Sequence, residues 1–342
     1  MISFKNDYSE GAHENIINLI VKSNLEQVDG YGEGDYSILA KGKIKKAIKN
    51  DNVDIHFISG GTQANLTVIS SILRPYESVI AAKTGHICVH EAGSIEATGH
   101  KINEIETENG KLYPELILSV LNEHTDEHMV KPKLVFISNS TEIGTVYTKE
   151  ELENLSKFCK NNDLLLYLDG ARLGSALTSE GNEVTLEDLS NLLDVFYIGG
   201  TKNGALLGEA IVIINDELKE DFRFNLKQKG ALLAKGRLIA IQFAELFTND
   251  LFFKLASHAN LMANKISDAI KELNFEFLTD SKSNQIFPIL PNKLINKLEK
   301  NYDFYIWQKI NNDMSAIRLV TSWATKELNV DEFIKDLKKY DE

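Results

Sequence analysis

The stretch Phe196-Tyr197-Ile198-Gly199-Gly200-Thr201-Lys202-Asn203-Gly204 places a single lysine on a turn bracketed by glycines. The turn joins two apolar runs, Val195–Ile198 and Ala210–Ile214, that are typical of buried strands. The turn is short, so we expect these strands to form an antiparallel pair at one edge of a larger sheet. Partial burial between strands would lower the pKa of a lysine and free its amine to attack a carbonyl. Lys202 is therefore a candidate nucleophile, with a solvated lysine as the alternative.

Strand-like and helix-like segments alternate on the N-terminal side of this turn, from about residue 50 onwards. A capping box of Thr148 and Glu151 opens one of the helices. The alternation predicts an α/β fold, with a mostly parallel sheet covered by helices on both faces. The predicted strands are Val53–Ser59, Ser78–Ala82, Lys133–Ser138, Leu164–Leu168, Val195–Ile198 and Glu209–Ile214, and the intervening helices include Thr62–Leu73 and Lys149–Asn161.

The pattern becomes helical from about residue 216, with helices predicted over Asp216–Ala231, Lys235–Phe247 and Leu251–Leu273. Short strands at Gln285–Leu290 and Ala316–Val320 then alternate with helices, which predicts a small α+β domain. We therefore expect an N-terminal segment (1–30), a large domain (31–250) and a small C-terminal domain (251–342).

The composition limits the classes of function. The 342 residues carry a formal net charge of −13, which argues against nucleic acid as a partner because a binder must neutralise phosphates. No run approaches a membrane span, and the first seven residues contain no apolar signal core. Cys88 and Cys159 have neither metal-ligand spacing nor a disulfide pattern. These features predict a cytoplasmic protein without a metal site or a membrane partner.

Ser59-Gly60-Gly61-Thr62-Gln63 follows a predicted strand and opens a predicted helix. The backbone N–H groups at such a helix start can cradle a phosphate, and Thr62 can add a hydroxyl donor. A plain turn with Thr62 as the N-cap is the alternative. A nucleotide-binding P-loop is excluded, because the Gly-Lys-Ser/Thr pattern is missing.

Two further polar residues follow apolar strands. Asp169 follows the apolar run Leu164–Leu168. Burying a carboxylate there costs free energy unless a cation or a hydrogen-bond donor pairs with it. The alternative is that Asp169 only caps a helix. His86 follows Ser78–Ala82 and could stack on a ring or act as a base. Ligands bind outside the carboxyl ends of strands in open α/β sheets. A phosphate cradle, an amine and a carboxylate for a ring nitrogen are what pyridoxal 5'-phosphate requires of its host.

Several motifs together resemble low-specificity L-threonine aldolases. They are Gly60-Gly61-Thr62-Gln63-Ala64-Asn65, His86 with Glu91-Ala92-Gly93, Leu168-Asp169-Gly170-Ala171-Arg172 and Gly200-Thr201-Lys202-Asn203-Gly204. That family belongs to the fold-type I (aspartate aminotransferase-like) pyridoxal phosphate enzymes. The resemblance runs from Tyr31-Gly32 to Ile317-Arg318-Leu319-Val320-Thr321-Ser322-Trp323, nearly the whole chain.

The resemblance implies a set of contacts to the cofactor. Lys202 would form the Schiff base, Asp169 would bind the ring nitrogen, and His86 would stack on the ring. The base that removes the substrate's hydroxyl proton would be His86, His128 or a bound water. Lys227 and Lys235 would reach the phosphate of a neighbouring subunit's cofactor, and the alternative is that these two lysines lie on a solvated helix face. The other implied contacts to the cofactor are Gly60, Gly61, Thr62, Asn139, Arg172 and Thr201.

The resemblance also implies the substrate and the assembly. It predicts cleavage of L-threonine or L-allo-threonine to glycine and an aldehyde, in a homodimer or homotetramer with shared active sites. Arg318 is expected to bind the substrate carboxylate. The other predicted substrate contacts are Asn6, Tyr31, Glu91 and Arg172. The alternatives are an aromatic amino-acid β-lyase, an aminotransferase, or a pyridoxal phosphate-binding protein without turnover.

Two segments depart from the family pattern. Many relatives have a Ser-Asp pair where this chain has Lys5-Asn6-Asp7, a segment that usually contacts the substrate carboxylate. Many relatives also have Glu-Asn-Thr-His where this chain has Ser138-Asn139-Ser140-Thr141-Glu142, so a histidine is missing there.

Overall fold

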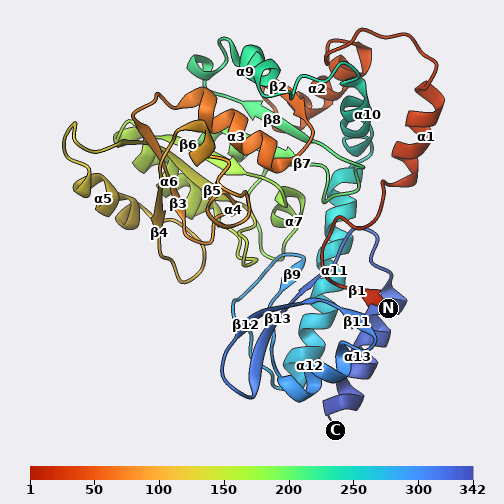
Figure 1. Ribbon diagram of the computed structural model, residues 1–342. Helices are drawn as coiled ribbons and strands as arrows, with labels where there is room; N and C mark the ends of the chain where they lie inside the picture. The colour runs from red at the N-terminus through yellow and green to blue at the C-terminus, as the bar shows by residue number, and fades with distance from the viewer. Residues whose placement is uncertain (342) are drawn as a thin grey trace.

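A computed structural model describes residues 1–341 of the chain. The chain folds into a large part built on a seven-stranded sheet and a smaller part with its own sheet. Helix α11 (Leu251–Glu272) runs from one part to the other, and both termini lie at the smaller part (Figure 1). No helix among the described residues is long and apolar enough to cross a membrane.

The large sheet has the strand order β2-β8-β7-β6-β5-β3-β4. All its strands are parallel except β8, which is antiparallel to both of its neighbours. The predicted antiparallel pair is therefore present. However, β2 adds outside β8, so the pair does not form the edge of the sheet. The strands are β2 (Asp54–Ile58), β3 (Glu77–Ala82), β4 (Ile102–Ile105), β5 (Lys131–Ser138), β6 (Leu165–Asp169), β7 (Val195–Gly199) and β8 (Glu209–Ile213).

Helices cover both faces of this sheet, as predicted. Alternate strand residues point to opposite faces, so Phe196 and Ile198 pack into one core while Val195 and Tyr197 pack into the other. On the first face lie α1 (Glu14–Ser23), α2 (Asp35–Ile48), α5 (Pro114–Glu123), α6 (Lys149–Asn161), α7 (Leu173–Leu177), α8 (Leu186–Leu192) and α10 (Arg237–Leu246). On the second lie α3 (Gly61–Ile72), α4 (His86–Val89) and α9 (Phe222–Gln228).

Local sequence explains where several helices begin. Thr148 and Glu151 form the predicted capping box of α6, in which the Thr148 hydroxyl accepts from the Glu151 N–H and the Glu151 carboxylate accepts from the Thr148 N–H. The helix predicted over Asp216–Ala231 is wrong as one element. It divides into a 3₁₀ turn, η2 (Asp216–Leu218), and α9, because Asp221 between them has a left-handed φ of 57°. Sequence analysis did not predict α1, α2, α5, β4 or the short 3₁₀ turn η1 (Glu96–Thr98).

The smaller part combines C-terminal residues with the first residues of the chain. Strand β1 (Ile2–Ser3) pairs in parallel with β11 (Tyr302–Asp303), and Phe4 is buried in the core of this part. The domain limits at residues 31 and 251 stay predictions. The remaining elements are β9 (Gln285–Ile286), β10 (Ile289–Pro291), α12 (Asn292–Leu298), β12 (Tyr305–Lys309), β13 (Met314–Val320) and α13 (Glu327–Asp341).

Candidate active site

The predicted site residues follow the carboxyl ends of parallel strands. Asp169 is the last residue of β6, and its backbone carbonyl accepts a hydrogen bond from the N–H of Asn139, which follows β5, at 3.0 Å. His86 follows β3, Gly60 follows β2, and Lys202 lies in the turn after β7. Since these strands run in one direction, their carboxyl ends meet at one edge of the sheet, where ligands bind in open α/β folds.

The turn that carries Lys202 is fixed by the buried Glu209. The Gly200 N–H and the Thr201 hydroxyl both donate to the Glu209 carboxylate, at 2.8 Å each. Burial raises the pKa of Glu209 to about 7. The Lys202 side chain is partly buried, and desolvation, followed by the nearby charge of Arg172, lowers the pKa of its amine. A lowered pKa increases the fraction of uncharged amine, the form that attacks a carbonyl.

A buried network holds the Asp169 carboxylate. Oδ1 accepts from the Tyr197 hydroxyl at 2.5 Å and from the Ala171 N–H at 2.9 Å, and Oδ2 accepts from Asn65 Nδ2 at 3.0 Å. The Asn65 amide is itself oriented, since its Oδ1 accepts from the Tyr167 hydroxyl at 2.9 Å. Both carboxylate oxygens are thus fixed by side chains from α3 and neighbouring strands.

The same asparagine connects Asp169 to His86. Asn65 Nδ2 also donates to Glu91 Oε1 at 2.7 Å, and that oxygen lies 2.8 Å from His86 Nδ1. The Ser94 hydroxyl donates to the other Glu91 oxygen at 2.7 Å. A carboxylate at this distance holds the proton on Nδ1, which leaves Nε2 of the His86 ring as the acceptor. Glu91 therefore orients His86, and its contact with the substrate stays a prediction.

The start of α3 provides a group of backbone donors. The first intrahelical hydrogen bond runs from the Ala64 N–H to the Gly60 carbonyl, so the N–H groups of Gly61, Thr62 and Gln63 have no helical partner. A Cβ on Gly61 would lie 2.9 Å from the Tyr197 hydroxyl, the same hydroxyl that contacts Asp169. Glycine at this position lets the helix start approach the Asp169 network closely.

A cavity of about 400 Å³ joins these elements to strands β12 and β13 of the smaller part. Lys202 and His86 lie on its large-part side, while Tyr305, Trp307 and Arg318 close the opposite side. The full lining is Tyr8, His86, His90, Glu142, Arg172, Lys202, Gln285, Tyr305, Ile306, Trp307 and Arg318.

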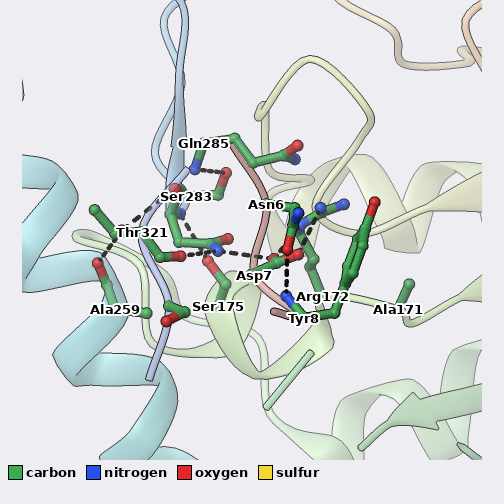
Figure 2. Close-up of polar contacts among 12 residues, drawn as sticks. Asn6, Asp7, Tyr8, Ala171, Arg172, Ser175, Ala259, Ser283, Gln285 and Thr321 are labelled. Atoms are coloured by element: carbon green, nitrogen blue, oxygen red, sulfur yellow. Dashed lines mark hydrogen bonds and ion pairs between the residues drawn. The ribbon is translucent and has the colours of Figure 1, made fainter. Parts of the chain in front are cut away.

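Arg172 is neutralised by Asp7. Its Nε and Nη2 atoms donate to the two Asp7 oxygens at 2.7 and 3.0 Å, and Asn284 Nδ2 donates to Asp7 Oδ2 at 3.0 Å (Figure 2). Burial alone would raise the pKa of Asp7, but Arg172 and Lys202 outweigh it and hold that pKa below its ordinary value. The segment Lys5-Asn6-Asp7, which differs from the family pattern, thus contacts the site through Asp7.

Asp7→Asn should lower the free energy of unfolding by about 3–5 kcal/mol at neutral pH, because Arg172 would stay buried without its charge partner. Since the pKa of Asp7 is lowered in the folded state, its stabilisation is present above the ordinary carboxyl pKa and is lost as the pH falls through the lowered one. Denaturant titrations of both proteins at neutral and acidic pH measure this. Equal unfolding free energies at neutral pH would contradict the role given to the pair.

Arg318 has most of its donors free. Its Nη2 donates to the Lys5 carbonyl at 3.3 Å, and its Nε has no hydrogen-bond partner within the described part of the chain. The guanidinium lies 5.3 Å from the ring centroids of both Tyr305 and Trp307, and burial, followed by the charge of Arg172, lowers its pKa. Of the two arginines in the cavity, Arg318 is the one without a carboxylate partner.

Comparison with known proteins identifies the family. A family model described as beta-eliminating lyase matches residues 29–292. The low-specificity L-threonine aldolase of a Pseudomonas species is 32% identical over 93% of this chain and 91% of its own length. The solved structure of Leishmania major threonine aldolase is 46% identical, covers all of both chains and superimposes with a TM-score of 0.99.

The chain belongs to the low-specificity L-threonine aldolase family. It is therefore an enzyme of the lyase class. Aspartate aminotransferase from Thermus thermophilus, at 15% identity over 99% of this chain and 91% of its own, has a TM-score of 0.73 and confirms the predicted fold-type I architecture.

This aldolase-family chain does not bring every predicted residue to its own cavity. Tyr31 lies exposed at the surface, where the Lys227 amine is 4.8 Å from the centroid of its ring. Lys235, two residues before the start of α10, is also exposed. None of the three lines the cavity that holds Lys202. The contacts of these three residues with cofactor or substrate stay predictions.

The prediction of His128 as a base does not hold within this aldolase-family chain. His128 precedes the first residue of β5, whereas Asn139, next to Asp169, follows the last one. It therefore lies at the opposite end of the sheet from the site. The resemblance suggested His128 as a base, but the sequence around a loop histidine does not indicate at which end of the sheet the loop lies.

Two other predicted contacts make hydrogen bonds within the chain itself. Thr201 donates its hydroxyl hydrogen to Glu209 and accepts from the Gly208 N–H, so it stabilises the turn and has no hydrogen left for the cofactor. Asn6 Oδ1 accepts from the Tyr8 N–H at 3.0 Å (Figure 2). It also accepts from the Ser9 hydroxyl at 2.9 Å, and these bonds shape the turn that carries Tyr8, which lines the cavity.

Sequence analysis of this family member did not assign several groups at the site. Asn65 lay within a quoted motif, and Glu142 within a segment described as lacking a histidine, but neither was given a role. Glu142 comes four residues after the end of β5, and Asn65 lies within the first turns of the helix that follows β2, so a polar side chain shortly beyond a strand end is a signal that could have found both. The others that were not predicted are Asp7, Tyr8, His90, Tyr197, Glu209, Asn284, Gln285, Tyr305, Ile306 and Trp307.

Proposed function

We propose that this chain binds pyridoxal 5'-phosphate through Lys202 and cleaves β-hydroxy-α-amino acids, such as L-threonine and L-allo-threonine, to glycine and an aldehyde. The observation that carries the proposal is the meeting of three groups. They are an amine of lowered pKa, a carboxylate fixed on both oxygens and a guanidinium without a carboxylate partner. Membership of the threonine aldolase family gives the reaction class.

The polar groups of the site fit the cofactor. Asp169 would hold the ring nitrogen, and the free N–H groups at the start of α3, with Gly60 ahead of them, would hold the phosphate. Asn139 is fully buried, and its Nδ2 has no hydrogen-bond partner among residues 1–341, although it follows the strand next to Asp169. A ring oxygen of the cofactor would satisfy this donor, whose burial unpaired would otherwise cost free energy.

The bound cofactor would supply an electron sink for the carbanion that bond cleavage leaves at Cα. The protein's own groups set up that chemistry. Lys202 provides the amine for covalent attachment, and Asp169 stabilises a proton on the ring nitrogen. The ring of His86, oriented by Glu91, offers a flat face for stacking.

Arg318 is proposed to bind the substrate carboxylate, because a guanidinium matches a carboxylate with two parallel hydrogen bonds. Arg318→Gln should raise KM for the amino acid about 10- to 100-fold, because the variant loses the binding free energy of charge-assisted hydrogen bonds to the carboxylate. Steady-state kinetics at saturating cofactor measures it. The matched control, Arg74→Gln, removes an exposed arginine that contacts only Tyr76 and should leave KM unchanged. An unchanged KM for Arg318→Gln would overturn the assignment.

A homodimer or homotetramer with shared sites is part of the proposal. It is supported by exposed apolar side chains on α1 and α2, which a second copy could cover, and by the exposed Tyr31, Lys227 and Lys235. The basic pair would then meet the phosphate of the neighbouring site. The exposed apolar residues are Ile17 and Val21 on α1, Leu25 just after α1, and Ile38 and Leu39 on α2. A cytoplasmic location is proposed as well, since the unpaired Cys88 and Cys159 suit a reducing compartment.

The test of the function is a stoichiometric assay. The protein, loaded with pyridoxal 5'-phosphate, is incubated with a panel of β-hydroxy-α-amino acids, and glycine and aldehyde are both measured. We expect equal amounts of the two products from threonine or allo-threonine. Ammonia with a 2-oxo acid would favour a β-lyase, and conversion of the cofactor to its amine form would favour an aminotransferase. Either result without glycine would refute the proposal.

A further inference from the structure

Among residues 1–341, Glu142 is the one residue with a carboxyl side chain that lines the cavity. Its Oε1 accepts two hydrogen bonds, from the His86 N–H at 2.9 Å and from the Ser138 hydroxyl at 2.7 Å. No other described residue donates a hydrogen bond to its second oxygen, Oε2. Two donors on Oε1 fix the carboxyl group in place, and Oε2 is left available to a ligand in the cavity.

The surroundings of Glu142 suit a group that exchanges a proton. Burial raises the pKa of Glu142 above its ordinary value, and the Ser138 hydrogen bond offsets only part of that rise. A carboxylate with a raised pKa is a stronger base than one in water and can take a proton from a hydroxyl more readily. Its two supports, Ser138 at the end of β5 and His86 at the start of α4, are part of the rigid strand-end framework.

The other proton acceptors in the cavity are less suitable. His86 is held at Nδ1 by Glu91, and its ring face is assigned to the cofactor. His90 is exposed at the mouth of the cavity, and no hydrogen bond from a described residue fixes its ring. Glu142 is held by two hydrogen bonds, lines the cavity and has no role in stacking on the cofactor.

We propose that Glu142 is the catalytic base that removes the proton from the substrate's β-hydroxyl. This inference rests on the proposed function. Oε2 takes the hydroxyl proton, and the O–H bonding pair becomes the second bond of the aldehyde carbonyl. As the Cα–Cβ bond breaks, a bound cofactor would supply the electron sink for its bonding pair, and Cα then takes up one proton from solvent to give glycine. Glu142 then releases its proton to solvent, which restores the starting state.

A merely structural role for Glu142 is the alternative, because its Oε1 also caps the N-terminus of α4. Glu142→Gln separates the two roles: the amide oxygen can still accept from the His86 N–H and the Ser138 hydroxyl, but the side chain cannot take a proton. Glycine supplies the second readout. Exchange of its α-proton with deuterated water uses the cofactor and Lys202 but involves no hydroxyl.

The experiment measures threonine cleavage and glycine α-proton exchange in the cofactor-loaded wild type and in Glu142→Gln. We expect kcat for cleavage to fall about 10²- to 10⁴-fold, while glycine exchange stays near the wild-type rate. Glu142→Asp, which keeps a carboxylate, should recover part of the cleavage rate. Glu123→Gln, an exposed residue at the end of α5, is the matched control and should change neither rate.

Two results would overturn the inference. If Glu142→Gln retained its cleavage rate, another group would be the base. If both rates fell together, Glu142 would act through the structure of the site. A wild-type protein that exchanges glycine protons yet cleaves no β-hydroxy amino acid would refute the proposed function instead, so the two failures are distinguishable.

Discussion

Lys202→Ala should abolish the cleavage of β-hydroxy amino acids, with kcat falling by about 10⁴-fold or more. The lysine is the only amine that lines the cavity within the described chain, and burial lowers its pKa toward the range in which it attacks carbonyls. No other residue there can replace its covalent attachment to the cofactor. The measurement is glycine release from threonine, together with the visible absorption of the lysine-bound cofactor, which should disappear.

The control for this change is Lys271→Ala, which removes an exposed lysine of α11 that pairs only with Asp268. It should leave both the activity and the absorption at wild-type values. A Lys202→Ala protein that kept the absorption of a lysine-bound cofactor would show that another lysine is the attachment site.

Asp169→Asn should lower kcat about 10²- to 10³-fold and change KM much less. The neutral amide keeps the size of the side chain but can no longer stabilise a proton on the ring nitrogen of the cofactor. The loss is therefore in the stabilisation of charge that develops during the reaction. Because Asn65, Tyr197 and the Ala171 N–H all donate to the present carboxylate, the amide also faces one donor too many. Steady-state kinetics at saturating cofactor separates kcat from KM.

Asp194→Asn is the matched control, since Asp194 accepts from the Leu166 N–H and from Asn215 at the opposite end of the same strands. We expect it to affect stability and to leave kcat close to the wild-type value. Equal losses of kcat in both variants would mean that the effect of Asp169 is structural.

The site residues that could be predicted from sequence are those whose chemical role is indicated by the residues next to them in the chain. Lys202 on its glycine turn, Asp169 at the end of an apolar strand and Gly61-Thr62 at a helix start are each defined by a few neighbouring residues. The α/β class followed in the same way from alternating strand and helix patterns. Together these groups indicated the cofactor, and the resemblance to a family then added the reaction and the substrate class.

The rest of the site could not be predicted because it depends on contacts between residues far apart in the chain. Asp7 meets Arg172 across 165 residues, and Asn65 connects Asp169 to Glu91 only once three elements have packed together. The aromatic wall at Tyr305 and Trp307 comes from β12, a strand that sequence patterns did not indicate. The same limitation placed His128 at the site, since local pattern does not say at which end of a sheet a loop lies.

The central claim is that Lys202 is the residue to which the cofactor is attached. The most direct measurement is to reduce the cofactor-loaded protein with borohydride, digest it and determine by mass spectrometry which lysine carries the pyridoxyl group. The account predicts stoichiometric modification of the peptide that contains Lys202, and no modification after prior incubation with excess glycine. Modification of a different lysine, or a protein that carries no pyridoxyl group after full loading, would contradict it.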